Sequence, residues 1–544
     1  MNSIIKLILG SLLLLSACTP VSADSLASSA TPASPTHPLI TETPIHTAAK
    51  APTGWVMFHA DEAHSGEVAG TGKINPKTGP EILATYRLFD QPKTEDELTG
   101  LRWTSTLPLA DLNGDGKLEI IVTTPDVGGT TLARLNGEPI PNMVQALAYS
   151  PGDSALKVLW TYKLDSPPGE AGIDTYSPAL ADADGDGLAD VIFTARDGFV
   201  RALSGLTGKM IWRFNMGAIT EAGPMLSDLD DNGKPEVVVV TDCKRGGVAC
   251  PPDGPASLYV LPLSAAGENQ ALWSYDYPYK MDSAEPVIAY VHGIGKIILA
   301  GTWGGELLAV WRTSVGEVRS TALKLLDLGQ IGSSEMPPVI RISPLVVYTK
   351  DGPLVIFGWL PSDLDVTNGR LTGVRLRAAD GKLKVEPAWT LDSLDTWKSS
   401  PTLVTSADGT HLMAVGYGLG IGPAPTQSGT VGSCQAKYVF GGVAAVDESG
   451  KIVWNQSFGN EEGNLRASAA VADIDGDGRK EVVIPAGCYG KLHAFDALSG
   501  EPEWALQLGP RTQTSPSIAD LDADGNLEIV IASYDGLVYV LGSR

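Results

Sequence analysis

One short acidic motif occurs five times in this chain, and each copy runs directly into an apolar stretch. The copies are "ADLNGDGKLEIIV" from Ala110, "ADADGDGLADVIF" from Ala181, "SDLDDNGKPEVVV" from Ser227, "ADIDGDGRKEVVI" from Ala472 and "ADLDADGNLEIVI" from Ala519. Counted from its first acid, each copy has Asp or Asn at positions 3 and 5, Gly at position 6 and an acid at position 9. Such repetition predicts an array of small units, although 544 residues would otherwise suggest three or four domains.

The spacing within these acidic loops predicts calcium binding. Side chains at odd-numbered positions can converge on one point, and Gly permits the sharp turn that a Cβ atom would obstruct. An EF-hand is excluded because it needs a bidentate Glu at position 12, where these loops carry only apolar residues. Since the flanking residues are predicted strands, the acid at position 9 would close each site from the start of the second strand of a hairpin.

The candidate calcium ligands are the residues at positions 1, 3, 5, 7 and 9 of each acidic loop. They are Asp111, Asn113, Asp115, Lys117, Glu119; Asp182, Asp184, Asp186, Leu188, Asp190; Asp228, Asp230, Asn232, Lys234, Glu236; Asp473, Asp475, Asp477, Arg479, Glu481; and Asp520, Asp522, Asp524, Asn526, Glu528. Five bound Ca²⁺ ions would change the formal net charge from −24 to −14. A single copy is also compatible with a chance acidic turn, but five matching copies are not. The acidic balance disfavours nucleic acid and anionic membrane surfaces as partners.

A longer repeat surrounds each loop and predicts an all-β fold. Residues 177–217 contain four short β-type runs, separated by the acidic loop, by "RDG" and by "LTGK", with a Trp in the last run. Four antiparallel strands over about forty residues are the size of one β-propeller blade. We expect a single eight-bladed propeller, with seven blades as the alternative. First strands are expected near Leu107, Pro178, Pro224, Pro286, Pro344, Pro401, Ala469 and Pro516.

Closure of the ring is predicted from the two ends of this repeat. The last copy stops at "SYDGLVYVLGSR" without a fourth strand, and residues 82–90 could supply one. Blades four, five and six replace the acidic loop with the tight turns "HGIGK", "KDGP" and "ADGT", so we expect no calcium there. The last-strand tryptophans are expected to pack between blades: Trp160, Trp212, Trp273, Trp389, Trp454 and Trp504.

Two families share these motifs. The acidic loops resemble FG-GAP or VCBS-type repeats, and the units ending in "LTGKMIW", "ESGKIVW" and "LSGEPEW" resemble PQQ-like repeats of quinoprotein-type propellers and outer-membrane assembly lipoproteins. The resemblance covers roughly residues 54–544 and implies a calcium-binding propeller that commonly has a binding role. The chain departs from the quinoprotein alcohol dehydrogenases in lacking a vicinal cysteine pair, and the assembly lipoproteins lack this calcium set.

The N-terminus predicts export and lipid anchoring. Lys6, an apolar run and "LSAC" resemble a lipobox, which implies a signal peptide over residues 1–17 and lipidation of Cys18. The alternative is an ordinary secretory peptide that is cleaved after Ala23. Residues 18–52 are rich in Ser, Thr, Ala and Pro and are expected to be a disordered tether. The propeller would occupy residues 53–544 and be anchored in the outer membrane or at the cell surface, as a monomer.

The long insertions are predicted to lie on the face of the disc opposite the calcium loops. They comprise residues 123–142, 241–257, 358–372 and 416–442. An even number of remaining cysteines outside the cytoplasm favours disulfides, with free buried thiols as the alternative. These cysteines are Cys243, Cys250, Cys434 and Cys488.

Blade connections near the central channel add a candidate ligand-binding set. It consists of Arg102, Trp103, Tyr176, Trp397, Lys398, Arg466 and Arg511. Aromatic residues beside cations suit a sugar or an anionic ligand, although the same residues could simply pack the channel.

Motifs for catalysis are missing from the sequence. The histidines form no HExxH or HxH pattern, and neither a GxSxG elbow nor a P-loop is present. We therefore expect a non-catalytic, calcium-stabilised lipoprotein that binds a protein or carbohydrate partner through the insertion face. The alternatives are a quinoprotein-like or polysaccharide-processing enzyme with its site at the channel mouth, and an envelope-assembly scaffold.

Overall fold

The structure is a computed structural model in which part of the chain is described. It describes residues 54–90, 106–124, 142–164, 176–243, 254–281, 284–325, 337–361, 369–394, 396, 398–418, 441–458, 462, 465–512 and 514–544, together with four two-residue strands at 134–135, 138–139, 420–421 and 438–439. These residues form strands, and none of them lies in an α-helix. No helix in this part of the chain is long and apolar enough to cross a membrane.

The first four blades are antiparallel four-stranded sheets in chain order. Blade 1 contains β3 (Leu109–Ala110), β4 (Glu119–Thr123), β7 (Met143–Ala148) and β8 (Lys157–Lys163). Blade 2 contains β9 (Ala179–Ala181), β10 (Asp190–Thr194), β11 (Phe199–Leu203) and β12 (Met210–Asn215). Blade 3 contains β13 (Met225–Ser227), β14 (Glu236–Val240), β15 (Ala256–Pro262) and β17 (Trp273–Tyr277). Blade 4 contains β18 (Val287–Val291), β19 (Gly295–Gly301), β20 (Glu306–Arg312) and β21 (Val318–Lys324).

The other four blades follow the same pattern, except that the fourth strand of blade 8 is β2, which precedes all the other blades in the sequence. Blade 5 contains β22 (Leu345–Thr349), β23 (Gly352–Trp359), β24 (Arg370–Ala379) and β25 (Lys382–Leu391). Blade 6 contains β26 (Thr402–Thr405), β27 (His411–Tyr417), β30 (Gly441–Asp447) and β31 (Ile452–Phe458). Blade 7 contains β32 (Ala470–Asp473), β33 (Glu481–Pro485), β34 (Lys491–Asp496) and β35 (Pro502–Gln507). Blade 8 contains β36 (Ser517–Ala519), β37 (Glu528–Ala532), β38 (Leu537–Gly542) and β2 (Glu81–Arg87).

Six short strands lie outside these blade sets. Strands β5 (Arg134–Leu135) and β6 (Glu138–Pro139) pair with each other, as do β28 (Gly420–Ile421) and β29 (Tyr438–Val439). Strand β16 (Gly267–Glu268) adds to blade 2 in parallel with β12, and β1 (Glu67–Thr71) adds to blade 7 in parallel with β32.

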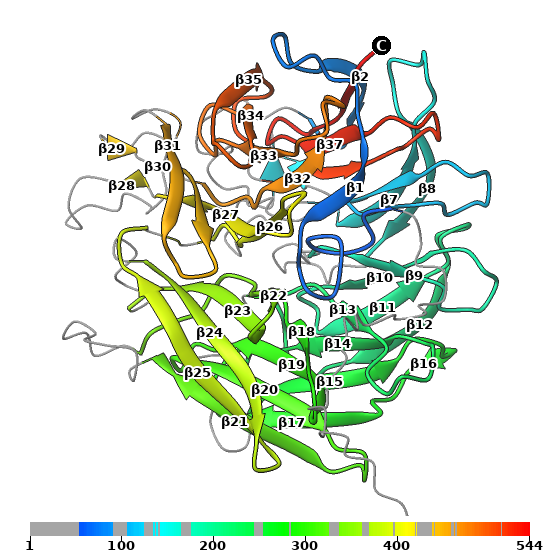
Figure 1. The fold of residues 1–544 in the computed structure, drawn as a ribbon. Helices are drawn as coiled ribbons and strands as arrows, with labels where there is room; N and C mark the ends of the chain where they lie inside the picture. Colours follow the sequence, from blue (N-terminus) through cyan, green and yellow to red (C-terminus); the bar gives the residue numbers. More distant parts are fainter. Residues whose placement is uncertain are drawn as a thin grey trace, which may run out of the picture. The chain divides into compact units, whose positions relative to one another are not determined.

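The ring of eight sheets confirms the predicted eight-bladed propeller (Figure 1). The second strand of each acidic-loop blade is buried along its whole length, because neighbouring blades cover both of its faces. Their sequences, such as EVVVV in β14 and EIVIA in β37, are correspondingly apolar after the first acid. The fourth strands alternate in burial, as in β8, which agrees with strands at the rim of the disc.

Closure occurs where the sequence predicted it. Strand β2 pairs antiparallel with β38, so blade 8 joins the N-terminal part of the propeller to its C-terminal end (Figure 1). The predicted segment 82–90 overlaps this strand, which begins one residue earlier and ends at Arg87.

An N-terminal segment, residues 54–74, bonds to the first strands of most blades, which the sequence did not indicate. Main-chain carbonyls of this segment accept N–H groups from blades 1, 2, 4, 5, 6 and 7 in turn. The pairs are Leu109 to Trp55 (2.8 Å), Leu180 to Val56 (2.7 Å), Ile288 to Glu62 (2.9 Å), Val346 to Ala63 (3.0 Å), Leu403 to Ser65 (2.7 Å) and Val471 to Gly66 (2.9 Å). The segment also reaches blade 8, where Leu527 donates to the Thr71 carbonyl at 3.2 Å. These bonds tie seven of the eight blades to one stretch of chain.

A second connection between blades involves the residue that precedes each first strand. The main-chain N–H at this position donates to the side-chain oxygen of the matching residue in the next blade. In five cases the acceptor is a serine Oγ. The donor and acceptor residues are Thr106 and Ser177 (3.2 Å), Glu285 and Ser343 (3.0 Å), Ser343 and Ser400 (3.1 Å), Ser400 and Ser468 (2.9 Å), and Ser468 and Ser515 (2.9 Å). Because these serines are buried, each bond satisfies a main-chain donor away from water.

Tryptophans from the fourth strands form a third connection. Four indole N–H groups donate to carbonyls in the next blade: Trp160 to Gly205 (2.6 Å), Trp212 to Leu263 (2.7 Å), Trp389 to Glu448 (3.0 Å) and Trp454 to Ala497 (3.0 Å). Glycines of the next blade lie against the indoles of Trp160, Trp389 and Trp454, where an added Cβ would approach within 2.5 to 2.6 Å. The predicted packing between blades is thus confirmed for Trp160, Trp212, Trp389 and Trp454.

Removing one of these indoles should therefore loosen a blade junction. We expect Trp454→Ala to lower the free energy of unfolding by about 3 to 5 kcal/mol, as for large-to-small changes in a core. Leu498→Ala in the adjoining turn is a suitable control, because Leu498 is 41% exposed and its loss should cost far less. Urea denaturation of both variants measures the difference, and equal stabilities would contradict the assigned role of Trp454.

Two buried histidines lie in the N-terminal segment. Both His59 and His64 are fully buried, and their Nδ1 atoms lie 3.2 Å and 3.0 Å from the carbonyls of His64 and Pro344. Their Nε2 atoms have no hydrogen-bond partner within the described part of the chain. Burial lowers the pKa of His59 to about 4 and that of His64 to about 3. Both rings are therefore neutral in the folded protein.

These histidines predict loss of stability in acid. Unfolded imidazoles take up protons near pH 6.5, so below this pH the unfolded state binds more protons and stability falls until the folded pKa values are reached. We expect the urea midpoint to decrease from pH 6.5 to pH 4. The stability of a variant with His59→Asn and His64→Asn should depend less steeply on pH, because Asn does not titrate. Asn is chosen because it tolerates the left-handed backbone at both positions. His292→Asn, in an exposed turn, should keep the wild-type slope; equal slopes in all three proteins would contradict this account.

Candidate metal centres in five acidic loops

The acid at position 1 shapes each loop by accepting main-chain N–H groups. In the second loop, Oδ1 of Asp182 accepts the Gly185 N–H at 2.6 Å and Oδ2 accepts the Gly187 N–H at 3.0 Å. Asp111 and Asp473 make the matching pair of bonds in their own loops. The carboxylate thus holds the turn around itself, as in an Asx-turn.

Two positions in each loop adopt left-handed backbone conformations. Position 6 is Gly in all five loops, with φ between 85° and 89°. Position 4 is also left-handed, and here the sequence varies: three loops have Gly, whereas Asp231 and Ala523 adopt φ values of 58° and 60°. A side chain at such a position is strained. The requirement at position 4 was not recognised from the sequence, although the "GDG" of three copies contains it.

The acid at position 9 is buried at the base of each loop. It is the first residue of the second strand, and its carboxylate accepts the N–H of position 2, as in Glu481 with Ile474 at 2.8 Å. Exposed fractions of these five acids are 1 to 5%. Burial raises the pKa of each: Glu119 to about 7, Asp190 to about 6, Glu236 to about 7, Glu481 to about 9 and Glu528 to about 8. A carboxylate in this environment is costly to ionise unless a cation lies beside it.

Positions 1, 3 and 9 converge in four of the five loops. In each of these groups, one carboxylate oxygen per residue lies within 4.8 Å of the others: Asp182, Asp184 and Asp190; Asp228, Asp230 and Glu236; Asp473, Asp475 and Glu481; and Asp520, Asp522 and Glu528. Oδ1 of Asp522 is buried and has no hydrogen-bond partner among the described residues. Oxygen-only donor sets of this kind suit a hard divalent cation such as Ca²⁺. The residues present therefore fit the predicted metal.

The first loop differs because position 3 is an amide. Nδ2 of Asn113 donates to Oε1 of Glu119 at 2.7 Å, and Oδ1 of Asn113 accepts the Asp115 N–H at 2.9 Å. This arrangement leaves Asp111 and Glu119 as the carboxylates nearest the centre of the loop. The amide oxygen would have to turn inward for Asn113 to become a ligand.

Position 5 has a different role from the one that the odd-numbered spacing suggested. Its side chain accepts the N–H of position 7, as in Asp186 with Leu188 and Asp477 with Arg479, both at 2.8 Å. It is not part of the converging groups at positions 1, 3 and 9. The residues at positions 5 and 7 were predicted as ligands, but their side chains are not among the converging groups.

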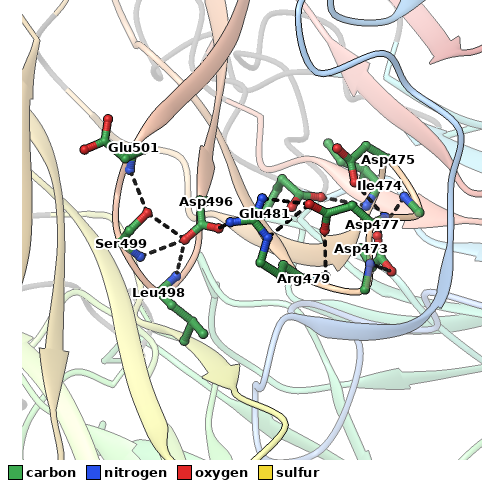
Figure 2. A network of polar contacts seen from close by, with 12 residues as sticks. Asp473, Ile474, Asp475, Asp477, Arg479, Glu481, Asp496, Leu498, Ser499 and Glu501 are labelled. Carbon is green, nitrogen blue, oxygen red and sulfur yellow. Dashed lines mark hydrogen bonds and ion pairs between the residues drawn. The ribbon is translucent and has the colours of Figure 1, made fainter.

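The loop of blade 7 is joined to a neighbouring turn of the same blade (Figure 2). The Arg479 guanidinium lies 2.7 Å from Asp477 and 2.7 Å from Asp496, which belongs to the turn between β34 and β35. Asp496 in turn accepts the N–H groups of Leu498 and Ser499 at 3.1 Å and 2.7 Å. The first-to-second and third-to-fourth turns therefore lie on one face of the disc, as predicted.

The predicted ligand-binding set falls only partly within the described residues. Arg102, Trp103 and Trp397 lie outside them. Arg511 is 5% exposed, with its guanidinium carbon 5.9 Å from the centre of the Tyr534 ring. The positive charge of Lys398 lowers the pKa of Glu285, although burial, the larger effect, raises it.

Tyr176 and Arg466 precede the first strands of blades 2 and 7, and the Tyr176 N–H donates to the Thr194 carbonyl at 3.4 Å. Whether the seven residues form one site therefore stays a prediction.

A cluster of aromatic and charged residues was missed by the sequence reasoning. The Trp303 ring lies 4.6 Å from Nζ of Lys280 and 4.2 Å from the guanidinium carbon of Arg341. Lys280 also pairs with Asp242 at 3.0 Å. These residues follow β14, β17 and β19 or precede β22, so blades 3, 4 and 5 each contribute. No motif marks them, because they are brought together only by the ring.

Two of the predicted disulfide cysteines are described. Cys243 and Cys488 are both buried, and both are bonded in disulfides. Cys250 and Cys434 lie outside the described residues, so the pairing of each cysteine stays a prediction.

Comparisons with known proteins support the repeat assignment. The family described as outer membrane protein assembly factor BamB matches residues 439–541, which span the last strands of blade 6 and most of blades 7 and 8. No curated protein matches the chain significantly.

Solved structures with the same fold include quinoprotein enzymes. A europium-containing methanol dehydrogenase is 13% identical, covering 91% of this chain and 98% of its own, with a TM-score of 0.53. Quinohemoprotein alcohol dehydrogenase from Comamonas testosteroni is 12% identical, covering 92% and 82%, also with a TM-score of 0.53. BamB from Moraxella catarrhalis is 13% identical, covering 85% and 99%, with a TM-score of 0.42. The first two of these structures share the β-propeller fold with this chain, and the match to PQQ-like repeats covers residues 439–541.

Proposed function

We propose that this protein is a calcium-stabilised, extracytoplasmic lipoprotein that binds a protein or carbohydrate partner. The acidic loops, of FG-GAP or VCBS type, would hold about five Ca²⁺ ions, and Cys18 would carry the lipid. The match to the assembly-factor family over residues 439–541 supports a location in the cell envelope and a protein partner.

The observation that carries this proposal is the buried acid at position 9. Four loops bring this acid within 4.8 Å of two further carboxylates, and burial raises its pKa. A divalent ion would balance the negative charge of the three carboxylates and favour the ionised form of the buried acid at position 9. At about 1 mM calcium and a Kd of about 10⁻⁴ M, each ion would stabilise the fold by about 1.4 kcal/mol, or about 7 kcal/mol for five.

The partner would bind through the long second-to-third connections. These join β4 to β7, β14 to β15, β23 to β24 and β27 to β30, on the face opposite the acidic loops. Long loops on a rigid scaffold are the usual place for recognition. The acids of the calcium loops are committed to metal and main-chain N–H groups, which makes them poor general acids or bases.

Calcium removal tests this proposal directly. We expect the melting temperature of the calcium-loaded protein to fall by more than ten degrees after chelation and dialysis. An unchanged melt would contradict a structural role for bound calcium.

Single-site variants test which residues hold the metal. Glu481→Gln should lower bound calcium from five equivalents to four in equilibrium dialysis, because it removes the buried charge of one loop. Asp477→Ala is the matched variant in the same loop, and it should weaken that site less, because Asp477 lies outside the converging group. Loss of all five ions together in either variant would contradict independent sites.

A quinoprotein-like enzyme is the second candidate, favoured by Trp303. An indole beside the two cations Lys280 and Arg341 suits a planar, anionic cofactor such as a carboxylated quinone. The fold is shared with the quinoprotein dehydrogenases, but a shared fold does not establish a shared activity.

Titration with pyrroloquinoline quinone in the presence of calcium separates the two candidates. The enzyme candidate predicts saturable binding, seen by cofactor absorbance, that Trp303→Ala weakens at least tenfold. Arg377→Gln, an exposed cation elsewhere on blade 5, should leave binding unchanged. Failure to bind at millimolar cofactor would contradict the enzyme candidate.

A further inference from the structure

The junction between blades 3 and 4 has a fourth-strand tryptophan but lacks the indole hydrogen bond of the 1–2, 2–3, 5–6 and 6–7 junctions. Trp273 occupies the fourth-strand position, yet within the described residues it makes no matching bond to a carbonyl of blade 4. The glycine of the blade 4 turn, Gly316, lies against Arg312, whose guanidinium nitrogen would be 3.3 Å from an added Cβ. In three other junctions the matching glycine lies against the indole. Trp273 is also only partly buried.

A pocket of about 600 Å³ lies at this junction. Its apolar lining includes Trp273, Trp311 and Leu272, and Val315 lies at its rim. Leu272 and Val315 are 50% and 79% exposed, so the apolar surface is open to solvent. The pocket has the size of sites that bind small ligands, and it lies beside the acidic loop of blade 3.

The rest of this junction is closed by tyrosines from the same strand. Residues 273, 275 and 277 alternate along β17, so their side chains share one face of the strand. The Tyr275 hydroxyl lies 2.7 Å from Oγ of Ser320 in β21, and the Tyr277 hydroxyl bonds to Glu306 in β20. Both tyrosines are thereby held by blade 4, whereas Trp273 is left at the pocket.

The polar lining carries both signs of charge. Nζ of Lys296 donates to the Asp228 carbonyl and lies 3.5 Å from Asp231. Arg312 is exposed, and its Nε donates to the Gly316 carbonyl at 3.2 Å. Asp231 supplies acceptors, Thr313 and Ser314 add hydroxyl groups, and the proposed calcium ligands Asp230 and Glu236 also line the pocket. The carboxylates disfavour an anionic ligand, and the cations disfavour a cationic one.

We propose that this pocket binds a neutral oligosaccharide of two or three sugar rings. A sugar ring presents an apolar C–H face that can pack on the Trp273 indole, and its hydroxyls both donate and accept hydrogen bonds. Such a ligand satisfies the mixed charges that an aromatic acid or a purely apolar molecule would leave unpaired. This site lies on the calcium face, so it is separate from the insertion face of the proposed function.

Isothermal titration of the calcium-loaded protein with neutral trisaccharides tests the proposal. The probes are maltotriose, cellotriose, laminaritriose and chitotriose, each to 10 mM. We expect at least one to bind with a Kd below 1 mM, with Trp273→Ala weakening it at least tenfold and Arg312→Gln at least threefold. The absence of binding by all four probes would overturn the proposal.

Two controls keep the result interpretable. Tyr275→Phe removes a hydroxyl from the same strand but outside the pocket lining, and Arg377→Gln removes an exposed guanidinium from blade 5; neither should change the Kd. Circular dichroism melts establish that Trp273→Ala is folded, and Val315→Arg provides a second variant that crowds the rim. Saccharide binding that survives both Trp273→Ala and Val315→Arg would overturn the assignment to this pocket.

Discussion

The fold depends on a buried carboxylate at the start of a strand. The acid at position 9 holds the acidic loop onto its hairpin by accepting the N–H of position 2, and it does so from a site with almost no access to water. The same burial that shapes the loop makes the negative charge unfavourable. Nearby carboxylates at positions 1 and 3 increase this cost unless a cation is bound. The local geometry of the loop and its proposed affinity for a metal ion would thus have the same origin.

Contacts between blades have a comparable regularity. Each blade is a small sheet that cannot bury both of its faces alone, and its neighbours supply the cover. Hydrogen bonds also join neighbouring blades: serine side chains accept them near the axis of the disc, and indoles donate them near its rim. The N-terminal segment crosses these units and bonds to seven of them. Each first strand pairs with the second strand of its blade along one edge only. Main-chain N–H groups on the other edge donate to the carbonyls of the N-terminal segment.

Much of this architecture could be predicted because it is periodic. The five loops, the eight first strands and the fourth strand near residue 82 follow from repeated spacing, which reports local structure. The path of residues 54–74 could not be predicted, because it depends on contacts with blades that are hundreds of residues away. The cluster around Trp303 was missed because its residues come from three blades and share no motif. Position 5 was assigned as a ligand from the odd-numbered spacing of the loop, whereas the side chains of Asp186 and Asp477 accept main-chain N–H groups.

The five acidic loops are not spread evenly around the ring. They belong to blades 7, 8, 1, 2 and 3, which are consecutive and include blade 8, where β2 pairs with β38. The remaining arc, blades 4 to 6, is connected by short turns that lack these acids. Changes in free calcium would consequently alter the rigidity of one contiguous arc, including the closure seam, and leave the other arc mechanically unaffected. With the proposed calcium bound, the disc would have one ion-dependent side and one ion-independent side.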